Sequence, residues 1–315
     1  MDSTAIETDM TEQIMTPLVR VQLAERQPAI WCKLEYLNPS GSTKDRIARF
    51  ILGKALRQRV IQPGGWVIEA SSGSTSIALA LASAQLNLKF LAVMPTGVSE
   101  ERIRMIRAFG AEVELTPKED GMSCAIDVAR QRAQERHGFL TEQFCNPDNP
   151  LAHRHQTAQE IMHQIPGGCV DAVVSGVGTG GTLVGLYQGL TDFGCEVIPV
   201  LARPTTGSEF SEPECYSFSG CIPGVVDGMS QIFQSADLPQ LREENVPDAL
   251  ALETARALIR RGFPVGPSSG LNFQAALQAA EELPPECIIV TVFPDRMERY
   301  FSTNLFLDST ANPSA

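Results

Sequence analysis

The chain has 315 residues, of which 43% are hydrophobic and 20% are charged, a composition typical of a globular protein with one large or two medium domains. Its 25 basic and 37 acidic residues give a net charge of −12 without a basic run, which argues against nucleic acid or an anionic membrane as a partner. The 8 cysteines show no C-x-x-C spacing and histidines number only 4, so we expect no metal site and a reducing, cytoplasmic setting.

Predicted elements in the first half alternate between strands and helices. Residues 1–13 form an acidic, polar lead-in that lacks the basic flank and apolar centre of a signal peptide, and no apolar run is long enough to span a bilayer. Helices are expected after the loops at 38–43 and 71–76, and at 100–109 and 124–136. Strands are expected at 29–35, 66–70, 90–95 and 112–115.

The second half continues this alternation after the break Asn146-Pro147-Asp148-Asn149-Pro150, where we place a domain transition. Strands are expected at 171–175, 197–201 and 288–293. Helices are expected at 157–164, 183–190, 247–262 and 265–283. Strands that alternate with helices predict an α/β fold built on parallel, doubly wound sheets.

Lys44 follows a tight turn and begins a helix. Pro39 and Gly41 are typical of a turn, and Ser42 or Thr43 can cap a helix that then shows apolar residues at helical spacing. The N-terminal end of a helix carries partial positive charge, which disfavours a charged lysine there. A lysine held neutral is an amine nucleophile able to form a Schiff base, whereas the simpler interpretation is a solvated surface lysine.

The most glycine-rich segment, residues 176–182, lies between a predicted strand and a predicted helix and is called the glycine loop below. Backbone amides without side chains can wrap a phosphate at a helix N-terminus. Gly176, Gly178 and Gly181 also satisfy the dinucleotide fingerprint, but the next strand ends in Ala202-Arg203 and not in the acidic residue that would hold a ribose. We therefore favour a phosphate monoester; glycines that serve only a turn are the remaining alternative.

Residues 38–46 resemble the cofactor-lysine motif of the cysteine synthase and cystathionine β-synthase family, which are pyridoxal-phosphate enzymes of fold type II. The resemblance runs in the same order from Thr16-Pro17-Leu18 to Glu298-Arg299-Tyr300, and we take this closing motif as structural. It implies that Lys44 carries pyridoxal 5′-phosphate as an imine. It also implies that the phosphate of the cofactor is held by Gly178, Thr179, Gly180, Gly181 and Thr182.

The segment Ser268-Ser269-Gly270 resembles the family's contact to the pyridine nitrogen, for which we favour Ser269 with Ser268 as the alternative. A hydroxyl does not keep that nitrogen protonated as a carboxylate would, so the resemblance favours loss of a β-substituent over transamination. A serine that only caps the helix is the simpler interpretation. Gly220, in a loop at 219–224, is also expected to face the cofactor.

Residues 71–76, called the serine loop below, place hydroxyls and amides at the start of a predicted helix, which suits an anion. Ser74 replaces the asparagine that contacts the ring hydroxyl of the cofactor in the family, and Ser76 replaces a glycine. Because this form of the loop resembles a side branch with cysteine desulfhydrase-like members, the two departures bear on the reaction more than on the cofactor. By resemblance, the substrate carboxylate is bound by Ser71, Ser72, Gly73, Thr75 and Gln143.

The resemblance implies two domains with the cofactor between them, a larger one from residues 1–43 and 149–315 and a smaller, mobile one from residues 44–148. The implied reaction is that of cysteine synthase, O-acetylserine plus sulfide to cysteine plus acetate, with Lys44 as the general base. The alternatives are β-elimination of cysteine, another β-replacement such as cystathionine synthesis, and a non-catalytic module that binds a partner's tail. Family members further imply a homodimer and, as a possible partner, the C-terminus of serine acetyltransferase.

Overall fold

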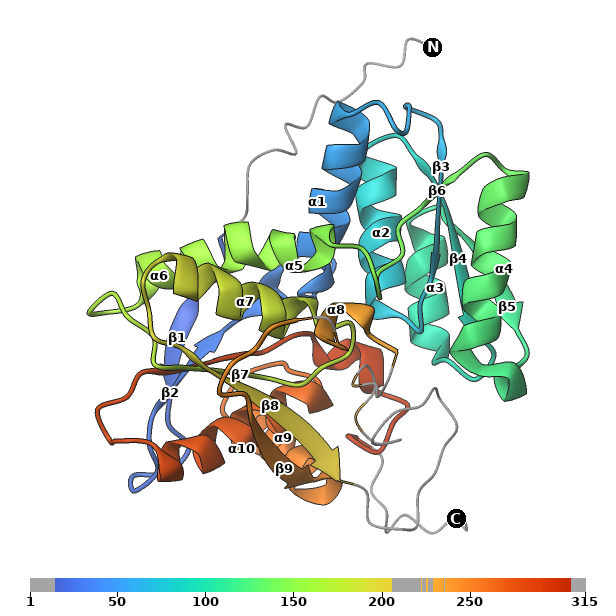
Figure 1. Ribbon diagram of the computed structural model, residues 1–315. Helices are drawn as coiled ribbons and strands as arrows, with labels where there is room; N and C mark the ends of the chain where they lie inside the picture. Colours follow the sequence, from blue (N-terminus) through green and yellow to red (C-terminus); the bar gives the residue numbers. More distant parts are fainter. Residues whose placement is uncertain (1–14, 206–221, 223–224, 226–228, 235, 307–315) are drawn as a thin grey trace, which may run out of the picture.

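The computed structural model describes residues 15–205, 222, 225, 229–234 and 236–306. Gly220, which is expected to face the cofactor, lies outside the described residues. The chain builds two sheets, one of six strands and one of four, each flanked by helices (Figure 1). The smaller sheet and its helices come from a continuous stretch in the first half of the chain. The larger sheet combines the beginning of the described chain with its second half.

The six-stranded sheet is parallel except at one edge. Its strands run in the order β1 (Leu18–Val21), β2 (Ile30–Lys33), β10 (Ile289–Val292), β7 (Ala172–Ser175), β8 (Ile198–Thr205) and β9 (Arg242–Pro247). The edge strand β1 pairs with β2 in antiparallel orientation, and the other pairs are parallel. The first strands are therefore built into the sheet of the C-terminal half, as the resemblance implies.

Helices cover both faces of this sheet because successive strand residues point to opposite sides. On β7, Ala172 and Val174 join a buried cluster with α9 (Asp248–Arg260) and α10 (Pro267–Glu282). The intervening Val173 joins a cluster with α6 (Ala158–Gln164) and α7 (Gly181–Asp192). Such continuous apolar strands are what a parallel sheet buried on both faces requires.

The four-stranded sheet repeats this arrangement on a smaller scale. Its strands run in the parallel order β5 (Glu112–Thr116), β4 (Lys89–Pro95), β3 (Trp66–Ala70) and β6 (Phe139–Leu140). Val67 of β3 packs with helices α1, α2 and α3, and the next residue, Ile68, packs with α4 on the other face. These helices are α1 (Lys44–Arg57), α2 (Ser74–Gln85), α3 (Glu100–Ala108) and α4 (Gly121–Glu135).

The predicted fold of two doubly wound sheets is confirmed, with three local differences. Strand β6 has only two residues, and β9 is a polar edge strand with little apolar signal, so neither was predicted. The short helix α5 (Asp148–Ala152) begins within the expected break at residues 146–150 and continues through a π-helical turn, His153–Thr157, into α6. The domain limits at 43/44 and 148/149 stay a prediction, although the four strands of the small sheet all lie between them.

The carboxyl ends of the parallel strands position the site. The serine loop follows β3, Gln143 follows β6, the glycine loop follows β7 and Pro294-Asp295 follows β10. In open α/β sheets, ligands bind beyond this edge. Among the described residues, no helix has the length and apolar character needed to cross a membrane.

Candidate active site

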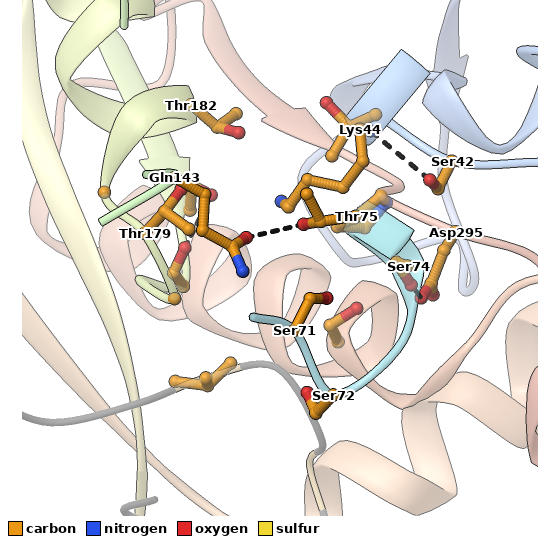
Figure 2. A pocket seen from close by; sticks show the side chains of 18 of the residues that line it. Ser42, Lys44, Ser71, Ser72, Ser74, Thr75, Gln143, Thr179, Thr182 and Asp295 are labelled. Carbon is orange, nitrogen blue, oxygen red and sulfur yellow. Dashed lines mark hydrogen bonds between the residues drawn. The ribbon is translucent and has the colours of Figure 1, made fainter. Parts of the chain in front are cut away.

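One pocket gathers these loops from both sheets. It encloses about 960 Å³ that protein atoms do not fill, part of which is open to solvent. Figure 2 shows the Lys44 side chain reaching into this space beside Thr75. Most of the residues predicted from the sequence line the pocket, namely Lys44, Ser71, Ser72, Ser74, Thr75, Gln143, Gly178, Thr179, Gly180 and Thr182.

Lys44 is the first residue of α1, as predicted, but the helix start is not capped as expected. The capping position is Thr43, whose side chain makes no capping hydrogen bond, and Ser42 Oγ instead accepts a hydrogen bond from the Lys44 amide at 3.3 Å. Burial lowers the pKa of the Lys44 amine, while the charges of Asp295 and Glu35 act in the opposite direction. The expected shift is therefore present, with burial and not the helix end as its largest cause.

The turn before Lys44 is held by the closing motif of the chain. Arg299 is buried and donates hydrogen bonds to the carbonyl oxygens of Ser40 and Gly41. Gly41 has φ +83°, a left-handed conformation that glycine adopts without strain. The Asp45 carboxylate accepts a hydrogen bond from the Ser40 amide at 3.0 Å. These contacts give Arg299 the structural role that was expected and fix the direction from which Lys44 enters the pocket.

The glycine loop ends at the first turn of α7, with Gly180 at the capping position and φ +82°. Gly181 does not line the pocket, in contrast to its predicted contact with the cofactor. A Cβ atom on Gly181 would lie 1.8 Å from Asn149 Oδ1, so this glycine makes room for the asparagine. Asn149 Nδ2 in turn donates to Thr179 Oγ1 at 2.9 Å, which orients one of the loop's hydroxyls.

A hydrogen bond connects the serine loop to Gln143, and it joins two residues that are predicted to bind the substrate carboxylate. Thr75 Oγ1 donates to Gln143 Oε1 at 2.6 Å (Figure 2). Gln143 Nε2 donates to the Ala70 carbonyl at 2.8 Å. A bound carboxylate would have to replace the first of these bonds, since an anion accepts from the Thr75 hydroxyl. Gly73 does not line the pocket; a Cβ there would lie 2.5 Å from Arg102 Cδ.

The structure favours Ser268 over Ser269 as the contact to the cofactor ring. Ser268 lines the pocket at the start of α10, whereas Ser269 is fully buried outside it. Successive residues of a helix point about 100° apart, and at the start of α10 it is Ser268 that reaches the pocket. Its position in the pocket therefore supports the alternative, Ser268, and the contact with the ring stays a prediction.

Sequence reasoning missed residues that reach the site from a distance. His153 is buried, and its Nε2 lies 3.3 Å from Thr182 Oγ1 while its Nδ1 lies 3.0 Å from Thr157 Oγ1. Burial lowers the pKa of His153 to about 3, so the ring is neutral at pH 7. Asp295 lines the pocket and accepts hydrogen bonds from Tyr300 Oη at 2.6 Å and from Ser74 Oγ at 3.3 Å.

Glu69 supports the Gln143 segment from beneath. It is buried at the end of β3, where it accepts hydrogen bonds from the Gln143 amide at 3.1 Å and from the Thr141 hydroxyl. Burial raises the pKa of Glu69 from its ordinary 4.5 to about 7, against the opposing effect of these hydrogen bonds. Its carboxyl therefore binds a proton more tightly in the folded state than in the unfolded state.

We expect replacement of Glu69 by glutamine to flatten the pH dependence of stability between pH 4.5 and 7. The wild-type free energy of unfolding should fall as pH rises through this window, by at most about 1.4 kcal/mol per pH unit, because the folded state retains a proton that the unfolded state has lost. Urea unfolding at several pH values measures the effect. Replacement of the exposed Glu100 by glutamine is the control, and wild-type and Glu69→Gln curves that stay parallel would contradict the prediction.

Comparisons with known proteins agree with this geometry. A protein-family model described as pyridoxal-phosphate dependent enzyme matches residues 10–295. A cysteine synthase of Staphylococcus aureus is 36% identical over 298 residues, which cover 92% of this chain and 94% of the relative. A crystal structure of O-ureido-L-serine synthase has a TM-score of 0.84 at 32% identity, covering 96% of this chain and 94% of the other. A hydrogen sulfide-producing enzyme from Fusobacterium nucleatum has a TM-score of 0.79 at 33% identity, with 90% and 96% covered.

Proposed function

Since the chain belongs to the family of pyridoxal-phosphate dependent enzymes, we propose that it exchanges the β-substituent of a serine derivative, most specifically by making cysteine from O-acetylserine and sulfide. One observation carries the proposal. An amine with a lowered pKa, a glycine loop at a helix N-terminus and a loop of hydroxyls meet in one pocket. The similarity to a cysteine synthase over 92% of the chain supports the choice among reactions of this class.

The chemistry of the pocket fits pyridoxal phosphate. Burial favours the neutral form of the Lys44 amine, the form that attacks an aldehyde. The glycine loop and the α7 N-terminus offer amides and partial positive charge to a phosphate, with Thr179 and Thr182 adding hydroxyls. Ser268, at the start of α10, offers a hydroxyl to a ring nitrogen. When bound, this cofactor withdraws electrons from the α-carbon of an attached amino acid.

The side chains of the chain itself supply binding and proton transfer. The serine loop, with the Thr75 hydroxyl released from Gln143, would bind the substrate carboxylate and hold the α-carbon near Lys44. The Lys44 amine would accept the α-proton, after which acetate leaves from the β-carbon as an anion and needs no further proton. Addition of sulfide to the β-carbon and return of the proton from Lys44 to the α-carbon complete the replacement.

Product analysis with purified, cofactor-loaded protein tests this proposal. With O-acetyl-L-serine and sulfide, we expect cysteine and acetate in equal amounts and little pyruvate. With O-acetyl-L-serine alone, pyruvate should appear far more slowly than cysteine does in the complete mixture. Pyruvate as the main product in both mixtures would contradict replacement as the principal reaction.

β-Elimination, from L-cysteine to sulfide, pyruvate and ammonia, is the second candidate. It is favoured by Ser74 and Ser76, which depart from the family loop, and by the similarity to a hydrogen sulfide-producing enzyme. Rapid release of sulfide from L-cysteine by the same preparation would support it. Cystathionine synthesis would instead be recognised by a requirement for homocysteine as the nucleophile. A protein that stays colourless after addition of the cofactor would support the non-catalytic binding module.

We further propose a cytoplasmic homodimer that can bind the C-terminus of serine acetyltransferase. Free thiols support a reducing compartment, since none of the 6 cysteines in the described ranges forms a disulfide: Cys32, Cys124, Cys145, Cys169, Cys195 and Cys287. The dimer and the partner rest on the family resemblance. Sedimentation of the protein with and without a synthetic peptide of that C-terminus tests both.

A further inference from the structure

Arg102 is a buried cation at the pocket that the proposed reaction does not use. It lies on α3, only 5% of its surface is exposed, and it lines the same pocket as Lys44. Its Nη1 donates to the Ser72 carbonyl oxygen at 3.1 Å, and its guanidinium lies 5.5 Å from the centre of the Tyr300 ring. Its Nε is buried and has no hydrogen-bond partner among the described residues.

The charge of this guanidinium has no counter-ion in the described part of the chain. Asp295 lines the same pocket but forms no ion pair with Arg102; its Oδ2 accepts hydrogen bonds from Tyr300 and Ser74, and its Oδ1 has no hydrogen-bond partner among the described residues. The neighbouring Glu101 accepts a hydrogen bond from Ser302 at 3.2 Å instead of pairing with Arg102. Because a buried charge without a partner is costly, its position at a binding pocket indicates that a bound anion completes the pair.

The two anions already assigned to the pocket have binding groups of their own. We assign the phosphate to the glycine loop and the α-carboxylate to the hydroxyls of the serine loop, which line the same pocket. Arg102 approaches the serine loop from α3, through the Ser72 carbonyl and beside Tyr300. The Arg102 guanidinium is therefore available to pair with a third negatively charged group on a bound ligand.

We propose that Arg102 binds an anionic group, a carboxylate or a phosphate, that a substrate carries on its β-side, beyond the α-carboxylate. The inference rests on the proposed function and narrows its substrate class. Two sources share this chemistry: the leaving group of the serine derivative, as in O-phospho-L-serine, and the nucleophile, as in a thiol that bears a carboxylate. Guanidinium forms charge-assisted, two-pronged hydrogen bonds with both groups.

Steady-state kinetics on the cofactor-loaded enzyme separates the two sources. One arm compares O-phospho-L-serine with O-acetyl-L-serine at fixed sulfide, and the other compares 3-mercaptopropionate with 2-mercaptoethanol at fixed O-acetyl-L-serine. In each arm, we compare kcat/KM for the anionic substrate with kcat/KM for the neutral one. We expect Arg102→Gln to lower this ratio about 10- to 100-fold in one arm, because the loss of a hydrogen bond to a charged group has an effect of about that size. Arg102→Lys should retain part of that ratio, and Arg104→Gln, on an exposed residue of the same helix, should retain all of it.

A ratio that Arg102→Gln leaves unchanged in both arms would overturn the inference, and an equal loss with every substrate would assign Arg102 to support of the serine loop. Failure of the proposed function is a different result, in which the wild type exchanges no β-substituent in either arm. Binding then decides the inference. Calorimetric titration of the loaded enzyme should give a tighter Kd for O-phospho-L-serine than for L-serine in the wild type, and Arg102→Gln should abolish the difference. Equal wild-type affinities within this pair, and also between 3-mercaptopropionate and 2-mercaptoethanol titrated into the same enzyme, would overturn the inference.

Discussion

Replacement of Lys44 by alanine is expected to lower kcat of the replacement reaction by on the order of 10³-fold or more. The general-base step alone contributes about 10²- to 10⁴-fold in enzymes, and the variant also loses the amine that attaches the cofactor. The free energy of unfolding should not fall appreciably in this variant, because burial disfavours the charged form of Lys44 in the folded protein. Kinetics and thermal unfolding of the purified variant measure both effects.

Two comparisons make the Lys44 result specific. Lys54 lies on the same helix, is 38% exposed and pairs with Asp148 at 2.6 Å, so Lys54→Ala should keep most of the activity. Lys44→Arg keeps the positive charge but cannot lose a proton near pH 7, and it should not restore turnover. Borohydride treatment followed by denaturation should leave the cofactor attached to the wild type and to Lys54→Ala, but not to Lys44→Ala. A Lys44→Ala enzyme with near wild-type kcat would contradict the assigned role.

Residues with a strong local signal were predictable from the sequence. Lys44, the serine loop and the glycine loop each follow a turn or a buried strand directly, so their positions depend on a few neighbouring residues. In parallel sheets, the carboxyl ends of strands meet at one edge, and the alternation of strands and helices therefore brought these segments together. The same alternation was sufficient for the two doubly wound sheets.

Residues whose role depends on packing between distant segments were not predictable. Asn149 was assigned to a break between domains, yet its amide orients Thr179 across the site. His153, which begins the π-helical turn between α5 and α6, contacts Thr182 on the distant helix α7. The choice between Ser268 and Ser269 depended on the rotation of α10, which a two-residue pattern does not specify. Arg102 lies on a helix with two glutamates and three arginines among nine residues, where the sequence favours a solvated residue.

A second large effect is expected from Arg46, two residues after Lys44 in the first turn of α1. Its guanidinium bonds Glu35 at 2.7 Å and Glu160 at 2.8 Å, and the exposed fractions of the three side chains are 3%, 0% and 3%. Lys33 joins the group through Glu160 at 2.7 Å. These residues connect the first turn of α1 to the segment after β2 and to α6, so they fasten the base of Lys44 to the six-stranded unit.

Arg46→Ala should lower the free energy of unfolding by about 3–5 kcal/mol, because it leaves the Glu35 carboxylate buried without its cation. The exposed pair of Arg154 and Asp192 is the matched control, and Arg154→Ala should cost at most about 1 kcal/mol. Denaturant unfolding at pH 7 measures both variants. A loss of less than about 1 kcal/mol for Arg46→Ala would contradict the assigned role of the network.

The pH dependence of the Arg46 variant separates lost charge pairing from lost packing. Burial alone would raise the pKa of Glu35, but the charge and hydrogen bonds of Arg46 outweigh burial and hold this pKa at about 2. In the wild type, this depressed pKa contributes stability that is complete above about pH 4.5 and is lost as pH falls toward 2. Without the guanidinium, burial dominates and the carboxyl favours its protonated form. The difference in stability between wild type and Arg46→Ala should therefore shrink from pH 7 to pH 4, whereas a cavity alone would leave it constant.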